Sequence, residues 1–150
     1  MKQVKYDILI KNGTVIDGTG NPGYRADVAT IGDTIAAIEP AISEQEANNV
    51  IDAAGKTVSP GFIDAHCHTD WAILERPSWD DHQERHGVTT QIGGLCGTSP
   101  IKIGDHLKQA FDRGLGTNYA LFAGHGSIRR EILGEENRKP TDEELKKMKG

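Results

Sequence analysis

Two histidines separated by one residue carry the strongest chemical signal in this 150-residue sequence. His66 and His68 follow the run GFIDA, which is typical of a short strand. Because side chains alternate between the two faces of a strand, the imidazoles point the same way and Cys67 points the other way. The spacing favours two ligands to one metal ion. A motif this short also arises by chance among surface histidines, so the neighbouring residues must decide between the two interpretations.

Two aspartates flank the histidine pair with the same parity. If the backbone stays extended, Asp64 and Asp70 share the face of His66 and His68. Carboxylates beside metal-bound imidazoles commonly fix the tautomer of the ring. We therefore expect the two aspartates to support the ligands or line the site. The alternative is an ordinary capping or solvated loop role.

Two further candidates follow the next predicted strands. Cys96 stands in GGLCG, and thiolate together with imidazole suits zinc, at distances of about 2.3 Å for sulfur and 2.0 to 2.1 Å for nitrogen. The alternative for Cys96 is a small buried hydrophobic residue. His125 stands in AGHGS, where it either faces the same site or is a turn histidine between glycines.

The elements that must position these residues fall into two groups. Residues 6 to 58 have the pattern of short strands, and the dipeptides Asn12-Gly13 and Gly32-Asp33 predict two-residue hairpin turns. Residues 60 to 150 alternate strand and helix three times, which favours parallel strands with crossover helices. The carboxyl ends of such strands carry the functional site. Three parallel strands do not close a barrel.

Composition narrows the functional classes. With 36% hydrophobic and 26% charged residues the chain is typical of soluble globular proteins. The 17 basic and 22 acidic residues give a net charge of −5, which disfavours binding to nucleic acid or to an anionic membrane. Two cysteines need no disulfide, and the N-terminal apolar run is too short for a signal peptide, so we expect a cytoplasmic protein.

Ordered motifs along nearly the whole chain resemble one family. The segments YDILIKNGTVIDGTGNPGYRADVATIGDTIAAI, VIDAAGKTVSPGFIDAHCHTD, GVTTQIGGLCGTSP and ALFAGHGSIRREILGEENRKPTDEELKKM are similar to the N-terminal part of N-acyl-D-amino-acid deacylases. These enzymes, also called D-aminoacylases, belong to the amidohydrolase superfamily. The sequence departs from the family at Gly94-Leu95, where Gly-Asn is usual, and at Cys67 and Thr69-Asp70, where HTHDD or a similar run is usual.

The resemblance implies an α/β architecture in two domains. Residues 1–58 match the N-terminal part of a β-sandwich, and residues 59–150 match the first three or so β/α units of an amidohydrolase-type TIM barrel, which is therefore incomplete. By motif, His66 and His68 correspond to the histidine pair of the first barrel strand. Cys96 corresponds to a zinc ligand of the family, and one or two zinc ions are implied.

The implied reaction is hydrolysis of the amide bond of an N-acyl-D-amino acid, a C–N bond outside peptides. The family's catalytic aspartate lies on a late barrel strand, beyond residue 150, so the catalytic residue is unknown here. We expect the 150 residues alone to lack deacylase activity, to bind zinc loosely at best and to need the remainder of the barrel for closure. The alternatives are another amidohydrolase, such as a dihydroorotase-like or hydantoinase-like cyclic amidase, or a non-enzymatic metal-binding module.

Overall fold

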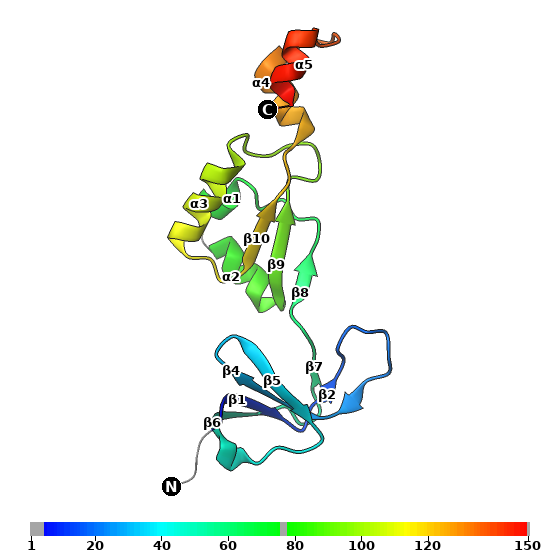
Figure 1. Ribbon diagram of the computed structural model, residues 1–150, viewed down its shortest axis with the longest axis vertical. Coiled ribbons are helices and arrows are strands. Elements are labelled where there is room, and N and C mark those ends of the chain that lie inside the picture. The colour runs from blue at the N-terminus through cyan, green and yellow to red at the C-terminus, as the bar shows by residue number, and fades with distance from the viewer. Residues whose placement is uncertain (1–4, 76–77, 150) are drawn as a thin grey trace. The chain divides into compact units, whose positions relative to one another are not determined.

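The computed structural model describes residues 5–75 and 78–149, in two compact units. The first unit is Met1–Pro60 and the second is Gly61–Gly150. Strands make up the first unit, and strands alternate with helices in the second (Figure 1). The candidate ligands all lie in the second unit.

Two small sheets form the first unit. The four-stranded sheet has the order β5-β4-β1-β6 and the three-stranded sheet the order β3-β2-β7. The strands are β1 (Tyr6–Lys11), β2 (Thr14–Val15), β3 (Tyr24–Arg25), β4 (Asp27–Ile31), β5 (Thr34–Glu39), β6 (Ala47–Asp52) and β7 (Thr57–Val58), and a 3₁₀ turn, η1 (Glu44–Glu46), precedes β6. One core cluster joins Tyr6, Leu9, Ala29 and Ile42, with Leu9 and Ala29 fully buried.

The Asn12-Gly13 turn passes the chain from one sheet to the other. The hairpin predicted there is wrong, because β1 and β2 belong to different sheets. Asn12 has the expected positive φ of 61°, but its backbone N–H donates to Asp27 and its side-chain amide donates to Asp52. These long-range hydrogen bonds redirect the chain, and a local turn rule cannot foresee them. The hairpin predicted at Gly32-Asp33 is confirmed, since β4 and β5 pair antiparallel around it.

A buried carboxylate ties the first unit together. Asp27 accepts hydrogen bonds from the Lys11 ammonium at 3.1 Å, from the Asn12 N–H at 3.0 Å and from the Ile42 N–H at 2.9 Å. Burial works against ionisation, but the two backbone donors and Lys11 together lower the pKa of Asp27. The hydrogen bonds of the Asp27 carboxylate therefore connect β4 with the end of β1 and with the loop before η1.

Three parallel strands in chain order form the sheet of the second unit. They are β8 (Phe62–Asp64), β9 (Val88–Gly93) and β10 (Asn118–Leu121), and β9 lies between the other two. The helices are α1 (Ala72–Glu75), α2 (Ser78–Arg85), α3 (Ile103–Arg113), α4 (His125–Leu133) and α5 (Asp142–Met148). The predicted strand and helix alternation is confirmed, and within the described residues the sheet stays open rather than closing into a barrel.

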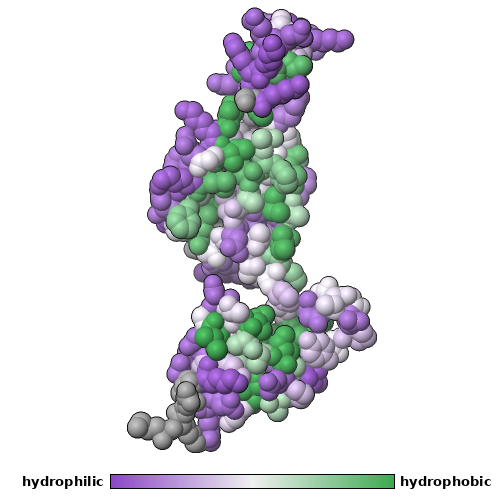
Figure 2. Space-filling model, in the orientation of Figure 1, coloured by the Kyte–Doolittle hydropathy of each residue, from purple (hydrophilic) through white to green (hydrophobic). Residues whose placement is uncertain are grey.

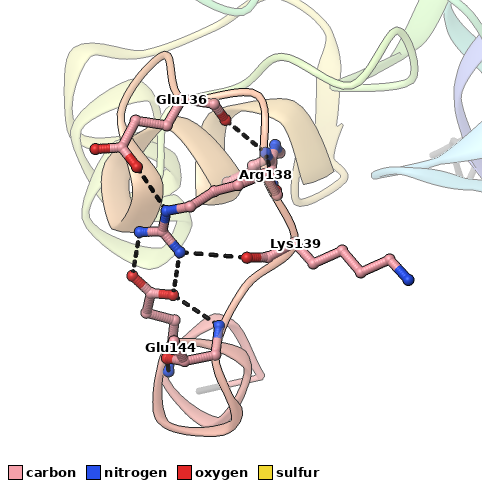
Figure 3. Close-up of polar contacts among 6 residues, drawn as sticks. Glu136, Arg138, Lys139 and Glu144 are labelled. Atoms are coloured by element: carbon pink, nitrogen blue, oxygen red, sulfur yellow. Dashed lines mark hydrogen bonds and ion pairs between the residues drawn. The ribbon is translucent and has the colours of Figure 1, made fainter.

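An arginine-centred network joins the loop after α4 to α5 (Figure 3). The Arg138 guanidinium donates two bonds to the Glu144 carboxylate, at 2.7 and 2.6 Å, and one to Glu136 at 2.5 Å. Glu144 also forms a capping box with Thr141. Arg138 and the Thr141 N–H together lower the pKa of Glu144 to about 2. These contacts fix the start of α5 although Arg138 and Glu136 are exposed.

Each unit exposes apolar side chains, and those on the visible side are green in Figure 2. Among the side chains that the structure describes in the second unit, the most exposed large apolar ones are Phe62, Ile63, Trp71, Phe111 and Phe122. None of the described helices combines the length and the apolar character needed to cross a membrane.

Candidate metal centre

The histidine pair lies just beyond β8, where the backbone bends. The Asp64 carboxylate accepts a hydrogen bond from the backbone N–H of His66 at 3.2 Å, which closes a short turn. Both imidazoles are exposed, and their ring centroids are 5.4 Å apart. Cys67 between them is buried and donates its backbone N–H to Ile92 of β9. The alternation expected of an extended segment therefore holds from residue 66 to residue 68.

Cys96 reaches the same place from the loop after β9. Its thiol is exposed, and Sγ lies 3.0 Å from Nε2 of His66. One ligand atom each from His66, His68 and Cys96 lies within 4.8 Å of the others. Ligand atoms of a tetrahedral zinc ion lie roughly 3.3–3.7 Å apart, by the usual bond lengths. The three side chains therefore fit one such ion with small rotations, and two nitrogens with a thiolate are a donor set that zinc favours.

Two glycines allow the Cys96 loop to sit where it does. Gly94 has a φ of 80°, and a Cβ there would overlap the backbone oxygen of Phe122. A Cβ on Gly124 would lie 2.6 to 2.8 Å from backbone atoms of residues 97–99. The loops after β9 and β10 thus pack backbone against backbone. Ser99 reinforces this contact, because its hydroxyl accepts the Gly124 N–H at 2.8 Å.

Asp70 is buried, whereas the two imidazoles are exposed. The chain turns at residues 70 and 71, and the Asp70 side chain is buried, where it accepts a 3.4 Å hydrogen bond from the Tyr119 hydroxyl. It occupies the space that a side chain at Gly93 would need. Burial, reinforced by the nearby Asp70 carboxylate, raises the pKa of Tyr119. Asp70 thus anchors the end of the ligand segment from the buried side.

His106 is a buried neighbour of this anchor that the sequence did not single out. It lies on α3 with 6% of its surface exposed, and its Nε2 has no hydrogen-bond partner among the described residues. Burial lowers the pKa of His106, while a hydrogen bond to the Asp70 backbone and the Asp70 charge oppose that shift. The signal available in the sequence was its place among Leu107 and Ala110 on the apolar side of the predicted helix.

His125 is not part of the three-residue group. It is the first residue of α4, after the Gly124 cap, and its side chain is exposed. His125 therefore stands in the first turn of a helix, next to the glycines of the motif AGHGS.

The sequence of this chain matches a known protein family. The Amidohydrolase family matches residues 49–142, and the chain belongs to this family. Over 96% of its length it is 33% identical to a D-aminoacylase of Alcaligenes xylosoxydans xylosoxydans, and the match covers 34% of that protein. The predicted resemblance to the N-terminal portion of D-aminoacylases is therefore confirmed.

Two solved structures have a fold similar to that of this chain. An N-acyl-D-glutamate deacylase from Bordetella bronchiseptica, complexed with zinc and a phosphonate inhibitor, aligns with a TM-score of 0.87 at 30% identity, over 96% of this chain and 35% of that one. An L-hydantoinase from Arthrobacter aurescens aligns with a TM-score of 0.65 at 25% identity, over 95% of this chain and 37% of that one. The predicted fold class is confirmed, and the chain spans about a third of the length of these relatives.

Proposed function

We propose that this chain is the leading part of a metal-dependent hydrolase of N-acyl-D-amino acids. The observation that carries the proposal is the convergence of His66, His68 and Cys96 at the carboxyl ends of β8 and β9. In an α/β barrel this is the edge where catalytic groups gather. The family membership and the likeness to a D-aminoacylase and an N-acyl-D-glutamate deacylase support the same assignment.

His66, His68 and Cys96 are the residues that would hold one or two zinc ions. A bound zinc ion supplies a Lewis acid for the amide carbonyl and lowers the pKa of a water molecule toward neutrality. The chain's own contribution is to hold two imidazoles and a thiolate on one exposed edge. Asp64 fixes the backbone at His66, and Asp70 anchors the segment from the buried side.

The remaining catalytic groups are expected outside these 150 residues. A general base and acid must carry a proton to the leaving amine, and we assign that role to an aspartate on a later strand. The exposed apolar residues of the second unit, among them Phe62 and Ile63 of β8, support a surface that further barrel elements cover. We also propose that residues 1–58 belong to a β-sandwich and residues 59–150 to the start of the barrel.

The substrate is proposed as a small molecule, and the location as the cytoplasm. Cys67 and Cys96 are both free thiols, which suits a reducing compartment. A cyclic amidase is the second candidate, because the L-hydantoinase shares the fold at 25% identity. The higher TM-score and identity of the deacylase favour the first candidate.

The test of this function compares the 150-residue protein with a longer product in which these residues are followed by the remaining barrel units. We expect the short protein to show no hydrolysis of N-acetyl-D-methionine, and the longer product to hydrolyse that substrate while sparing the L enantiomer. Hydrolysis of hydantoin in place of the acylated D-amino acid would favour the cyclic amidase. Turnover by the short protein would show that no later residue is needed.

Metal binding provides an independent test on the short protein. Alanine at His66, His68 or Cys96 is expected to weaken zinc binding, measured by competition with a chromophoric chelator. Alanine at the exposed His82 on α2 is the matched control and should leave the affinity unchanged. Equal affinity for all four variants and the unmodified protein would contradict the assigned ligand set.

A further inference from the structure

A row of buried polar side chains lies beneath the histidine pair. The Thr69 hydroxyl donates to Oε1 of Gln91 at 3.0 Å, and the Gln91 amide donates to the Thr117 hydroxyl at 2.8 Å. Sγ of Cys67 is 3.3 Å from the Thr69 hydroxyl oxygen. Because the single hydroxyl proton of Thr69 is used toward Gln91, the Cys67 thiol is the donor in this contact. The bonds therefore run in one direction from residue 67 to residue 117.

Gln91 is an unusual residue for its position. It lies on β9, the central strand of the parallel sheet, with none of its surface exposed. Burying an amide without partners costs about 1–3 kcal/mol in proteins, whereas an apolar residue at such a position is the common choice. The amide instead has satisfied partners on both sides, from the ligand segment and from the start of β10. Such a network fixes one arrangement of the side chains that it joins.

The network holds the residues next to the two histidines in place. Cys67 lies between His66 and His68, and its backbone N–H is bonded to Ile92 at 3.1 Å, next to Gln91 on the same strand. Thr69 follows His68 directly, and its carbonyl accepts the Ile73 N–H at 2.8 Å where α1 begins. With positions 67 and 69 held on the buried side, positions 66 and 68 must face outward.

The same strand leads into the loop that carries the thiol. Gln91 precedes Cys96 by five residues, and Gly93 and Gly94 lie between them. The central strand β9 therefore supports all three ligands. Its Gln91 side chain is bonded to the segment that carries His66 and His68, and its backbone continues into the loop that carries Cys96. We propose that Thr69 and Gln91 are positioning residues that set the separation of the His66 and His68 imidazoles from the Cys96 thiolate. This inference rests on the proposed metal site.

The test removes single hydrogen bonds and measures zinc affinity in the 150-residue protein. Thr69→Val keeps the shape and deletes the hydroxyl, whereas Thr69→Ser keeps the hydroxyl. We expect Thr69→Val and Gln91→Leu to weaken zinc binding by about ten- to hundred-fold, the usual effect of losing a group that orients metal ligands. Thr69→Ser should restore nearly the original affinity.

A destabilised control separates positioning from a general loss of stability. Ala110→Gly removes a buried methyl group from α3 and touches none of these bonds, so it should lower the melting temperature and leave zinc affinity unchanged. If Thr69→Val does not fold, Cys67→Ala deletes only the thiol donor and is expected to weaken binding in the same direction by a smaller factor.

Hydrogen exchange in the metal-free protein gives a readout that does not depend on zinc. The Cys67 amide should exchange faster in Thr69→Val than in Thr69→Ser, because its bond to Ile92 loses support. Unchanged affinity and unchanged exchange in Thr69→Val and Gln91→Leu would overturn the inference. If alanine at His66 weakens zinc binding while Thr69→Val does not, the positioning role fails and the proposed metal site stands. If alanine at His66 also leaves the zinc affinity unchanged, the proposed metal site fails and the positioning role fails with it.

Discussion

Alanine at Gly94 is expected to damage the second unit far more than alanine at Gly97 in the same loop. Both glycines have a φ of 80°, so both substitutions force a side chain into the left-handed region. Their surroundings differ. A Cβ at position 94 would overlap the backbone oxygen of Phe122, whereas a Cβ at position 97 would find its nearest neighbour, the Gly126 nitrogen, at 3.8 Å.

The magnitudes follow from these two contacts. The left-handed conformation costs an L residue about 1–2 kcal/mol, and this is the whole expected loss for Gly97→Ala. Gly94→Ala adds an overlap with backbone that no side-chain rotation relieves, and overpacking of this kind costs a further ~1–3 kcal/mol. The free energy of unfolding should therefore fall by about 2–5 kcal/mol in Gly94→Ala, when the two contributions are added.

Urea unfolding followed by tryptophan fluorescence measures the difference. Both tryptophans of the sequence, Trp71 and Trp79, belong to the second unit, so the signal reports on that unit. Equal losses in the two variants would refute the close backbone approach of Gly94 to Phe122. Zinc affinity in the same samples should fall for Gly94→Ala, because the Phe122 N–H bond to Gly93 beside the loop is displaced.

Three further predictions concern charged groups. Asp27→Asn should destabilise the first unit by about 3 kcal/mol, as expected when one partner of a buried ion pair is removed, and amide exchange in β1 should show the loss while tryptophan fluorescence does not. Burial lowers the pKa of His106 below 6.5, so the imidazole of the unfolded chain binds a proton at a higher pH than that of the folded protein. The contribution of His106 to stability is therefore complete above pH 6.5 and falls as the pH drops below that value. Thermal melting of the metal-free protein should show this pH dependence, and His106→Gln should reduce it. The Glu144 carboxyl should titrate near pH 2 by NMR, so its contribution to stability is complete above pH 4.5 and is lost between pH 4.5 and about 2. Arg138→Lys should raise the pKa of Glu144, because lysine cannot donate the two parallel hydrogen bonds of Arg138. An unchanged pKa would contradict this two-bond contact.

Local spacing was enough to predict the residues that converge. His66 and His68 are separated by one residue in an extended segment, and Cys96 follows the next strand, so chain order alone brings them to one edge of a parallel sheet. The alternation of strand and helix was likewise visible, because Gly114 ends α3, glycines flank α4 and Thr141 caps α5.

The parts that could not be predicted depend on contacts between distant residues. Asp70 keeps the parity of the histidines only while the backbone is extended, and the turn at residues 70 and 71 sends its side chain to Tyr119. Asn12 has the conformation of a hairpin residue, yet Asp27 and Asp52 determine where the chain goes. A prediction from the turn residues alone takes neither of these distant aspartates into account.

Gln91 shows the same limit for a buried polar residue. In the run VTTQIG it reads as an ordinary strand residue, and its partners Thr69 and Thr117 lie 22 and 26 residues away. The available signal was a single amide within a strand of the predicted parallel sheet. A polar group in that place requires partners, although the sequence does not say which ones.

Cobalt(II) absorption gives the most direct measurement of the proposed centre, because a thiolate bound to cobalt produces a charge-transfer band. We expect the band to appear when Co²⁺ is added to the 150-residue protein, to persist in Cys67→Ser and to disappear in Cys96→Ser. The buried Cys67 and the exposed Cys96 are the two cysteines of the chain, so each controls for the other. A band that survives Cys96→Ser would contradict the metal centre formed by His66, His68 and Cys96.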